Sequence, residues 1–286
     1  MTKDFKTTGL HSMLNVSIVL YKTSLNDLGR CIESVKKYSK VKKVILVDNS
    51  PTDELKQVVK LHDNVEYIFN PKNPGYGAGH NIALKMTIHD EIEYHLVVNA
   101  DVYFTEGTLD ALVEYMNRNS DVGLVMPKVL FPNGEIQYLC KLVPTPLDLI
   151  VRMILPKKLL LKNNFKFEMR STNYNREMFV PYLSGCFMFL RMSALKKCGL
   201  FDERFFMYPE DIDLTRRIAT HYKTMFYPEA IVYHEYGAAS KKSIKMFLIH
   251  VINIIKYFNK WGWVFDSERT RLNKIATLNL YRDINK

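Results

Sequence analysis

The sequence predicts an α/β fold in which a mostly parallel central sheet carries helices on both faces. Two observations lead to this prediction. Short apolar runs alternate with helical patterns as far as Gly134, and polar residues follow the ends of several of these runs. Strand, helix and strand at this spacing indicate parallel strands joined by crossover helices. The length of 286 residues is enough for one large domain with its own core.

The alternation can be followed along the chain. Leu28, Ile32 and Val35 lie on one face of the first predicted helix, and Ser24, with Asp27 three residues later, is typical of its N-cap. The other elements follow from the same apolar runs and helical periods. The expected strands are Leu14–Tyr21, Val44–Val47, Val65–Phe69, Tyr94–Val98 and Val122–Met126, and the expected helices are Leu25–Tyr38, Glu54–Lys60, His80–Ile88 and Leu109–Asn117.

The regular rhythm ends after Gly134. Residues 141–180 mix basic and apolar side chains with several prolines, so we expect an inserted and partly irregular segment there. Regular patterns then resume as strands Tyr182–Arg191, Lys223–Tyr227 and Ile231–His234, and as helices Ser193–Lys197, Glu210–Thr220 and Lys241–Trp261. We therefore expect one domain over residues 1–236, followed by a basic, amphipathic helical tail over residues 237–286.

Positive charge gathers in two segments. The formal net charge is +10, and residues 141–180 carry +5 while residues 237–286 carry +7. Both segments are also rich in Leu, Ile, Met and Phe, which favours an anionic membrane surface over nucleic acid as the partner. The alternative is that the last helix packs on the core or forms a dimer interface. Its expected apolar face is Ile244, Phe247, Leu248, Val251, Ile255 and Phe258, and its polar face is Lys242, Lys245, Asn253, Lys256 and Lys260.

Cysteine usage and apolar content indicate a compartment. The four cysteines are scattered and form no CxxC pair, which suits free thiols in a reducing compartment and no zinc site. Residues 1–12 are polar and include Asp4, unlike a secretory signal. No apolar run approaches the roughly 20 residues that span a bilayer. We expect a cytoplasmic protein held peripherally at the inner face of the cell membrane.

Polar groups follow four predicted strands, where ligands bind in open α/β sheets. These groups are Tyr21, Asp48 with Asn49, the glycine-rich loop 73–81, and Asn99 with Asp101. Asp48 could accept hydrogen bonds from a nucleobase or a ribose hydroxyl, or could simply close an Asx turn. The loop lets backbone approach a ligand before a helix begins, or is only structural. Its GxGxG spacing is not the dinucleotide fingerprint.

Other side chains are of types that bind metal ions or act as catalytic bases. Asp101 could hold a divalent ion on a diphosphate, or could cap a turn. Glu210 and Asp211 open a helix after an aromatic run, a place where the helix dipole favours acids in any protein. A carboxylate there, beside an apolar wall, also suits a general base for a hydroxyl. His234 ends a strand, and a lone histidine is more often structural than a ligand.

In their order and spacing these motifs resemble inverting family 2 glycosyltransferases, which have the nucleotide-diphospho-sugar transferase (GT-A) fold. The branch that they resemble is that of the bacterial rhamnosyltransferases, which build surface polysaccharides such as O-antigen. The similarity runs from Val16 to Gly237. Its carriers are Val16–Tyr21, Asp48-Asn49-Ser50, Asn73-x-Gly75-x-Gly77-x-Gly79-x-Asn81, Asn99-Ala100-Asp101-Val102, Leu183-Ser184-Gly185-Cys186, Gly199-Leu200-Phe201-Asp202-Glu203, Glu210-Asp211-x-Asp213 with Arg217, and His234.

The resemblance implies a role for each matched residue. Asp211 would be the catalytic base. Asp101 would hold Mg²⁺ or Mn²⁺ on the donor diphosphate, with His234 as the second protein ligand. Many relatives have Asp where this chain has Asn99, which implies coordination by a single carboxylate. The acceptor side would comprise Glu210, Gly185 and Cys186, and the donor would be bound by Tyr21, Asp48 (which holds the base), Asn49, Gly75, Gly79, Asn81, Asn99 and Arg217.

The resemblance also implies the reaction, in which one inverting displacement moves a sugar from a nucleotide-sugar donor to a hydroxyl of a glycan acceptor. Acceptors of such pathways are usually carried on a polyprenyl diphosphate. The first donor to expect is dTDP-L-rhamnose, and a UDP-hexose is the alternative. No oligomeric state follows from the sequence.

Other classes of protein fit the sequence less well. A sugar nucleotidyltransferase would need a glycine-rich basic loop after the first strand, and a non-catalytic sugar-binding module would not need both Asp101 and Asp211. An NAD-dependent oxidoreductase is disfavoured because the first strand leads into Tyr21-Lys22-Thr23 and not into a glycine turn.

Overall fold

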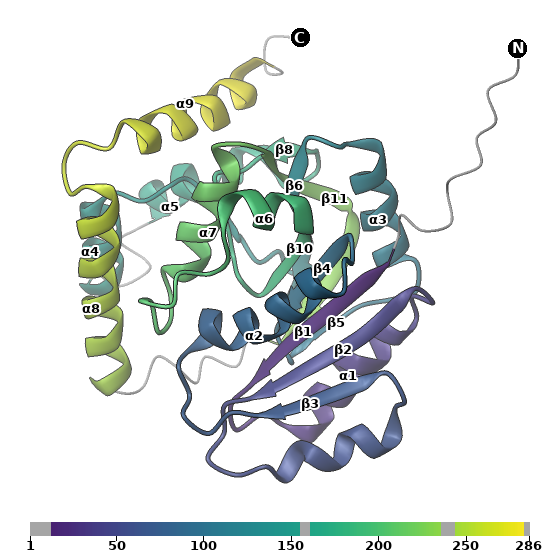
Figure 1. Cartoon of the computed structure of the whole chain (residues 1–286). Coiled ribbons are helices and arrows are strands. Elements are labelled where there is room, and N and C mark those ends of the chain that lie inside the picture. The colour runs from purple at the N-terminus through teal and green to yellow at the C-terminus, as the bar shows by residue number, and fades with distance from the viewer. Residues whose placement is uncertain (1–12, 155–160, 236–243, 283–286) are drawn as a thin grey trace, which may run out of the picture.

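A computed structural model describes residues 13–154, 161–235 and 244–282 of the chain (Figure 1). In chain order these residues form β1 (Leu14–Leu20), α1 (Leu25–Lys36), β2 (Val41–Asp48), the 3-10 helix η1 (Glu54–Leu61), β3 (Val65–Phe69), α2 (Tyr76–His89), β4 (Tyr94–Val98), β5 (Val102–Tyr103), α3 (Thr108–Arg118), β6 (Val122–Leu130), β7 (Cys140–Lys141), α4 (Pro146–Ile154), α5 (Leu161–Phe167), the 3-10 helix η3 (Arg170–Thr172), β8 (Met178–Phe179), β9 (Tyr182–Leu183), β10 (Phe187–Arg191), α6 (Met192–Cys198), α7 (Glu210–Ala219), β11 (Lys223–His234), α8 (Ile244–Trp261) and α9 (Ser267–Arg282).

Nine strands of the described residues join in one sheet, in the order β3-β2-β1-β4-β10-β6-β11-β5, with β8 paired to β11. The strands from β3 to β4 are parallel, as are β6 and β11. Strand β10 runs antiparallel to both of its neighbours, β4 and β6. In Figure 1, α2 and α6 lie on the near face of the sheet and α1 lies on the far face. The predicted α/β class, with helices on both faces, is confirmed.

Three predicted elements differ from the structure. Helix α2 begins at Tyr76, inside the glycine-rich loop, and not at His80. The expected strand Tyr182–Arg191 is interrupted by a turn at residues 184–186, which separates β9 from β10. The two strands expected around Pro228 are one strand, β11, whose pairing with β6 is irregular between Tyr227 and Ile231. Proline has no N–H to donate to a ladder, so the pairing is interrupted while the strand continues.

Segment 141–180 is more regular than expected, because it contains helices α4 and α5. The start of α4 is a capping box: the Thr145 N–H donates to Asp148 Oδ2 at 2.8 Å, and the Asp148 N–H donates to Thr145 Oγ1 at 3.1 Å. Thr145-Pro146-x-Asp148 is a standard helix-start signal, so the sequence did contain the evidence for α4. Helix α9 also lies beyond the elements that were expected.

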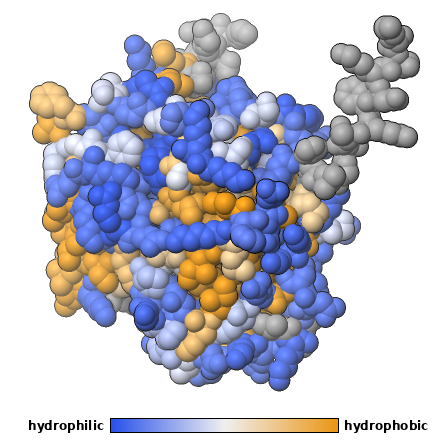
Figure 2. All heavy atoms as spheres, viewed as in Figure 1, coloured by the Kyte–Doolittle hydropathy of each residue, from blue (hydrophilic) through white to orange (hydrophobic). Residues whose placement is uncertain are grey.

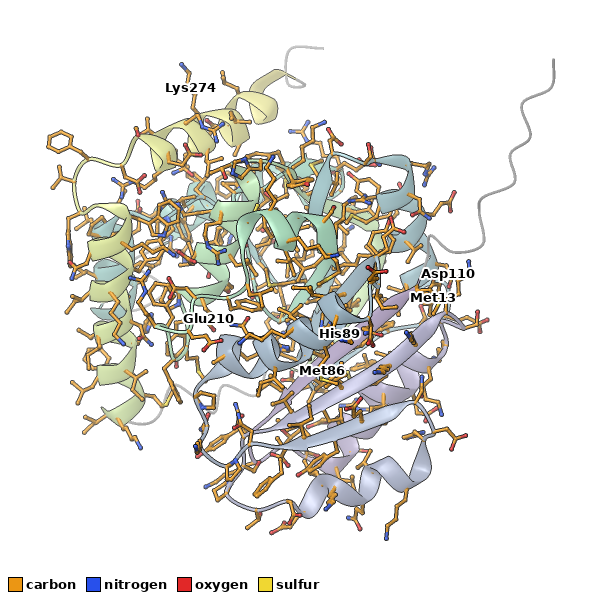
Figure 3. The ribbon with its side chains drawn as sticks, in the orientation of Figure 1. Met13, Met86, His89, Asp110, Glu210 and Lys274 are labelled. Carbon is orange, nitrogen blue, oxygen red and sulfur yellow. The ribbon has the colours of Figure 1, made fainter. Side chains whose placement is uncertain are left out.

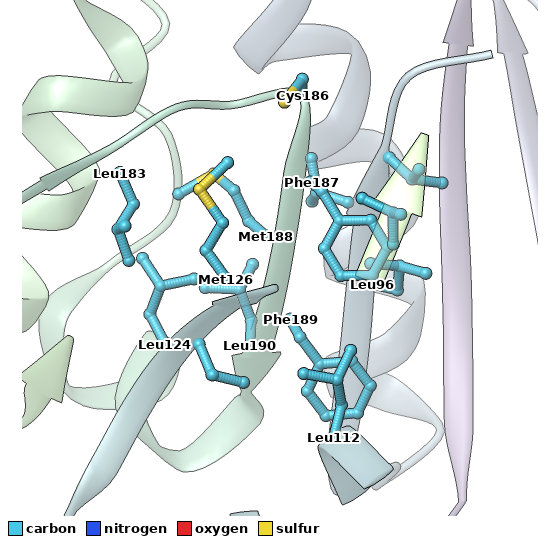
Figure 4. Packing of buried hydrophobic residues seen from close by; sticks show 14 of the residues in the cluster. Leu96, Leu112, Leu124, Met126, Leu183, Cys186, Phe187, Met188, Phe189 and Leu190 are labelled. Atoms are coloured by element: carbon cyan, nitrogen blue, oxygen red, sulfur yellow. The ribbon is translucent and has the colours of Figure 1, made fainter. Parts of the chain in front are cut away.

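The core is built around β10, whose five residues are all buried and whose first four, Phe187 to Leu190, are apolar and fully buried. Successive side chains of a strand point to opposite faces of the sheet. Phe187 and Phe189 therefore point to the side of Leu96, while Met188 and Leu190 point to the side of Met126 (Figure 4). Helices cover both faces, which explains why this strand is continuously apolar and not alternating.

The second half of α8 packs on the main body of the protein. Tyr257 and Phe258 are fully buried and form a cluster with Tyr182, Phe205 and Ile212. Phe205 precedes α7 and Ile212 is part of it, so α8 contacts the segment that carries the acidic motif. Phe258, expected on the apolar face of this helix, is part of the core, as in the alternative in which the last helix packs on the core.

A buried ion pair joins α7 to the connection between α8 and α9. Nη2 of the fully buried Arg216 lies 2.8 Å from both carboxylate oxygens of Asp266. Its Nη1 donates to the Tyr257 hydroxyl at 2.7 Å, and its Cζ lies 3.9 Å from the centre of the Trp261 ring. A buried guanidinium needs partners of this kind, because an unpaired charge in the interior costs several kcal/mol.

One stripe of α8 remains exposed, and Figure 2 shows hydrophobic atoms along the edge of the molecule where this helix runs. The exposed apolar side chains of the helix are Ile244, Phe247, Leu248, Ile252 and Ile255. Asn253, expected on a polar outer face, is buried and donates to the Met207 carbonyl oxygen at 2.9 Å. Lys242 lies outside the described residues. Across the described ranges, the structure contains no helix with the length and apolarity needed to cross a membrane.

We expect Asp266→Asn to destabilise the protein by about 3–5 kcal/mol, because it leaves the buried Arg216 charge without its counter-ion. Urea unfolding followed by circular dichroism would measure the change. The matched control is Glu114→Gln, which removes a carboxylate from the mostly exposed pair with Arg118 and should change stability by about 0.5 kcal/mol or less. Equal effects of the two substitutions would contradict the assigned importance of the buried pair.

Candidate active site

The glycine-rich loop is a tight turn that starts α2. Gly75 has a φ of +109°, and a Cβ at this position would lie 2.2 Å from the carbonyl oxygen of Phe206. The same oxygen accepts the Tyr76 N–H at 3.0 Å. A Cβ on Gly79 would lie 2.9 Å from the side chain of Val19 in β1. These two glycines therefore let α2 approach β1 and the segment before α7, which already accounts for them without a ligand.

Asp48 and Asn49, at the end of β2, are buried and hydrogen-bonded within the protein. Asp48 Oδ1 accepts the Ser50 N–H at 2.9 Å, which closes the expected Asx turn, and Oδ2 accepts the Tyr67 hydroxyl at 2.6 Å. Asn49 Nδ2 donates to the Gly75 carbonyl oxygen at 3.3 Å. A carboxylate oxygen can accept more than one hydrogen bond, so a contact of Asp48 with a nucleobase would add to bonds that already exist.

Asn81 and Arg217 both hold the connection between α6 and α7. Asn81 Oδ1 accepts the Phe201 N–H at 3.0 Å, and its Nδ2 donates to the Phe201 carbonyl oxygen at 2.9 Å. Arg217 donates to the carbonyl oxygens of residues 198–200 and to Asp213 Oδ2. Since the polar atoms of these two residues bind the protein itself, the geometry favours a positioning role over direct contact with a donor.

Tyr21 and Lys22 extend beyond the end of β1. The Tyr21 side chain is exposed, and Lys22 Nζ lies 5.8 Å from the centre of its ring. Lys22 has a φ of +51°, and its N–H donates to Ser50 Oγ at 2.8 Å, which ties this turn to the end of β2. The exposed ring of Tyr21 is suited to stack on a nucleobase, and the adjacent Lys22 cation is suited to pair with a phosphate.

Asp101, which follows β4, faces His234 at the end of β11. Asp101 Oδ1 lies 3.3 Å from His234 Nε2. On the other side of the ring, Nδ1 lies 2.9 Å from Gln137 Oε1, while Gln137 Nε2 donates to the His234 carbonyl oxygen at 2.7 Å. The second bond fixes the orientation of the Gln137 amide, so Nδ1 carries a proton and Nε2 is directed at Asp101. Burial lowers the pKa of His234, but hydrogen bonds with Asp101 and Cys186 raise it overall, to about 10.

This pair fits a divalent ion that is held in part by another molecule. An imidazole whose Nδ1–H is bound by an oxygen, and whose Nε2 faces a carboxylate, has the arrangement of a metal ligand with its supporting contact. The described residues contain no group of three or more His, Cys, Asp and Glu side chains that could hold a metal ion. Asp101 and His234 would therefore supply two ligands, and diphosphate oxygens or waters would supply the rest.

Two buried carboxyl groups begin α7, and Glu210 is labelled there in Figure 3. Asp211 Oδ2 accepts the Gly185 N–H at 3.0 Å, and Oδ1 accepts the Ile212 N–H at 2.7 Å. Glu210 Oε2 is buried and has no hydrogen-bond partner within the described part of the chain. A buried carboxyl oxygen without a partner is unfavourable in the free protein and suits contact with a ligand.

Burial raises the pKa of both carboxyl groups. The pKa of Asp211 rises to about 6, against the opposing effects of the Gly185 N–H and the positive charge of Lys141. Burial and the adjacent Asp211 carboxylate raise the pKa of Glu210 well above its ordinary value. At neutral pH Asp211 is therefore mainly ionised, while burial shifts Glu210 towards its protonated form. Neighbouring carboxyl groups with raised pKa values are typical of an active site.

The turn between β9 and β10 contacts both the acidic residues at the start of α7 and the Asp101–His234 pair. Gly185 binds Asp211 through its N–H, and the next residue, Cys186, contacts His234. The Cys186 carbonyl oxygen also accepts the Asn99 N–H at 3.0 Å. Cys186, expected on the acceptor side, thus has its side chain at the predicted metal pair.

Sequence reasoning missed three residues of this site: Tyr76, Gln137 and Lys141. The Tyr76 hydroxyl donates to the Gly185 carbonyl oxygen at 2.8 Å and to Asn99 Oδ1 at 3.0 Å. Its position within the glycine-rich motif was a signal for Tyr76. Gln137 and Lys141 lie in a connection without regular pattern, and only the tertiary structure brings them to the site.

Comparison with known proteins agrees with this geometry. Residues 16–199 match the model of glycosyl transferase family 2. The chain is 29% identical over 210 residues to the N-acetylglucosaminyl-diphospho-decaprenol L-rhamnosyltransferase of Mycobacterium tuberculosis; the match covers 67% of this chain and 66% of that protein, just under two thirds of its length. Over 220 residues it is 24% identical to rhamnosyltransferase WbbL of Escherichia coli, which covers 72% of this chain and 79% of that protein.

A solved structure supports the fold. GalNAc-T7 with UDP, GalNAc and Mn²⁺ superposes with a TM-score of 0.60 at 16% identity, over 80% of this chain and 44% of that chain. The predicted GT-A fold is confirmed by this similarity.

Proposed function

This chain belongs to glycosyl transferase family 2, and we propose that it moves a sugar from a nucleotide-sugar donor to a hydroxyl of a glycan acceptor, with inversion at the anomeric carbon. One observation carries the proposal: the turn at Gly185 and Cys186 contacts both the Asp211 carboxylate and the His234–Asp101 pair. A proton acceptor and a pair of candidate metal ligands therefore lie at one edge of the sheet. A sugar-binding module has no need of two adjacent buried carboxyl groups, which favours a transferase.

We propose dTDP-L-rhamnose as the donor and a glycan on a polyprenyl diphosphate as the acceptor. Support comes from the names of the two relatives, both rhamnosyltransferases, one of which is named for a diphospho-decaprenol substrate. A UDP-hexose is the alternative donor. Melting temperatures measured with a panel of nucleotide-sugars would test the choice, because a bound donor stabilises the fold by mass action. Release of a nucleoside diphosphate would then separate transfer from binding.

The proposed reaction is a single displacement. Asp211 accepts the proton of the acceptor hydroxyl while the hydroxyl oxygen forms a bond to the anomeric carbon of the sugar. The bond from that carbon to the diphosphate breaks, and its electron pair stays on the leaving diphosphate. Glu210, whose pKa is raised by burial, would donate a hydrogen bond on the acceptor side in its protonated form. Asp101 and His234 would hold Mg²⁺ or Mn²⁺, which stabilises the charge of a diphosphate when it is bound.

Asp211→Asn should lower kcat about 10²- to 10⁴-fold, since the proton acceptor is lost. Donor affinity should stay near wild type, because Asp101, His234 and Asp48 are unchanged. In the wild-type enzyme, kcat/KM should rise with pH through about 6, the pKa of Asp211. Initial rates of diphosphate release over a pH series would measure both effects. The control is Glu210→Gln, which keeps a hydrogen-bond donor and should do less damage; the reverse order of damage would mean that Glu210 is the base.

The same substitution has a consequence for stability. The fold raises the pKa of Asp211 from 3.8 to about 6, so ionisation of this group opposes folding. The stability that its protonated form contributes is present below pH 3.8 and is lost as pH rises to about 6. Asp211→Asn removes this unfavourable ionisation, but its single amide oxygen can accept from only one of the Gly185 and Ile212 N–H groups. The two effects oppose each other, so the free energy of unfolding at pH 7, measured with urea, should stay within about 1 kcal/mol of wild type. A much larger loss would contradict this balance.

Metal binding should require Asp101 and should release a proton. The pKa of His234 is about 10, so at pH 7.5 Nε2 carries a proton that a metal ion must displace. Calorimetry in two buffers of different ionisation enthalpy should report about one proton released per Mn²⁺ bound with a nucleoside diphosphate. Asp101→Ala should abolish this binding. Full transferase activity in excess EDTA would contradict the arrangement.

We propose that the exposed stripe of α8 rests on an anionic membrane surface. The stripe is apolar, residues 237–286 carry a net charge of +7, and Leu147 and Ile150 of α4 are also exposed. The opposite face of α8 binds the segment that leads to Asp211, so attachment would bring the site close to a lipid-linked acceptor. Two lysines of the expected polar face contact the protein: Lys256 donates to the Arg204 carbonyl oxygen, and Lys260 pairs with Asp202 and Asp213.

The double variant Phe247→Ser and Leu248→Ser should bind vesicles of phosphatidylglycerol and phosphatidylcholine at least roughly tenfold more weakly, because each exposed side chain contributes about 1 kcal/mol when buried in lipid. Co-sedimentation would measure it. The matched control is Leu25→Ser, an exposed leucine on α1, which should leave binding unchanged. Equal sedimentation of all forms would refute the proposal. A dimeric wild type that becomes monomeric in the double variant would assign the stripe to a subunit interface.

A further inference from the structure

The Tyr76 side chain is partly buried at the meeting point of the two halves of the site. Its ring packs edge-on against His80, with ring centres 4.5 Å apart, and contacts Phe201. These contacts leave the ring one orientation, in which the hydroxyl reaches the Gly185 carbonyl oxygen at 2.8 Å and Asn99 Oδ1 at 3.0 Å. Burial raises the pKa of Tyr76 well above its ordinary value, and the nearby acidic groups act in the same direction, so it remains a neutral donor.

The Gly185 residue is held at both of its polar atoms. Its carbonyl oxygen accepts from Tyr76, and its N–H donates to Asp211 Oδ2 at 3.0 Å. A Cβ at Gly185 would lie 3.4 Å from both the Tyr76 ring and the Asp211 Cβ, so Gly185 packs between Tyr76 and Asp211. Glycine is the residue with the greatest backbone freedom, and a glycine in a turn keeps one orientation only where its neighbours fix it.

We propose that Tyr76 is a positioning residue that orients Gly185 so that its N–H stabilises the ionised form of Asp211. Its expected effect on the rate of sugar transfer rests on the proposed function, whereas its expected effect on the pKa of Asp211 does not. An N–H that donates to a carboxylate lowers the pKa of that carboxylate. Tyr76 thereby helps to keep Asp211 ionised at neutral pH, although the carboxylate is buried.

Asn99 completes the arrangement. One phenolic proton cannot fully serve two carbonyl-type oxygens, but an amide side chain can turn and present its Nδ2 as a donor to the phenol oxygen. The proton of Tyr76 is then left for Gly185. A carboxylate at position 99 has no such donor, and it would attract the phenolic proton away from Gly185 because hydrogen bonds to charged acceptors are stronger. This gives a physical reason for the pairing of Asn99 with Tyr76 in this chain.

Other groups that face Asp211 also affect its pKa. Glu210 lies beside it on α7, and Lys141 of β7 lowers its pKa. Tyr182 of β9 also interacts with it electrostatically, and burial keeps that phenol neutral. In the described ranges the Tyr76 hydroxyl donates to Gly185 and Asn99 and not to any of these groups, so removal of the hydroxyl changes the Gly185 bond and leaves them in place.

The test is the variant Tyr76→Phe, in which the titration of Asp211 is followed by NMR. The protein is labelled with ¹³C at the aspartate carboxyl carbons, and the Asp211 signal is assigned by its absence in Asp211→Asn. The pKa of Asp211 should rise by about 0.5 to 1 unit in Tyr76→Phe. Transfer at pH 5.5 should then fall about three- to tenfold relative to wild type, recover at pH 8, and show a donor KM within about twofold of wild type. p-Aminophenylalanine at position 76 keeps a donor in the same place and should restore the wild-type titration.

The matched control is Tyr94→Phe. Tyr94 is fully buried, and its hydroxyl likewise donates to an asparagine oxygen, Asn117 Oδ1, at 2.6 Å, but at the other end of β4. It should leave the titration of Asp211 unchanged. If Tyr76→Phe does not fold, p-fluorophenylalanine at position 76 fills the same space without a donor and replaces it.

An unchanged pKa of Asp211 in a folded variant without the phenolic donor would overturn the proposal. The NMR titration needs no substrate, so it distinguishes this failure from a failure of the proposed function. If no donor and acceptor support transfer but the pKa shift is observed, Tyr76 still positions Gly185 and the assigned reaction is wrong.

Discussion

The antiparallel strand β10 in the middle of the sheet is the constraint on which the site depends. Phe187 at its start pairs with Val98 at the end of β4, so the residues just before β10 must lie at the carboxyl edge of the parallel strands. This register carries Gly185 and Cys186 to Asn99, whose N–H binds the Cys186 carbonyl oxygen. A parallel strand in the same place would put its preceding turn at the opposite edge of the sheet. The contacts to Asp211, His234 and Tyr76 all follow from this one reversal.

The burial of two carboxyl groups at the site is unfavourable, and well-paired charges on the same helix offset this cost. Asp211 and Glu210 are both nearly inaccessible to water, and neither has a cationic partner within hydrogen-bond distance in the described residues. Desolvation of such groups is costly, and functional sites often retain this cost. Farther along the same helix, Asp213 pairs with Arg217 and Lys260, and Arg216 pairs with Asp266. Well-paired charges thus fix the helix whose first turn carries poorly paired ones.

Helix α8 connects this arrangement to the surface. Its buried side holds the segment before α7 through Asn253, Lys256 and the cluster around Tyr257, while its other side is an exposed apolar stripe. A force that acts on the stripe is therefore transmitted to the segment that carries the acidic motif. The same helix serves stability and, under our proposal, attachment, so removal of the whole helix could not separate the two roles. Substitutions confined to the stripe can.

The sequence by itself determined the α/β class, the strands of five or more residues, the first-turn acids of α7 and the motifs of the family, because these depend on local periodicity and on residue types at fixed spacing. Other features were decided only by tertiary structure, among them the two-residue strands β5, β7 and β8. Asn81 and Arg217, which match donor-binding positions of the family, bind the backbone of residues 198–201 in the structure, and both Phe258 of the apolar face of α8 and Asn253 of its polar face are buried. Gln137 and Tyr76 reach the site through contacts between segments distant in the chain. Periodicity shows that a helix has two faces, but which face is buried depends on the surface it meets, and that surface exists only after the sheet has assembled.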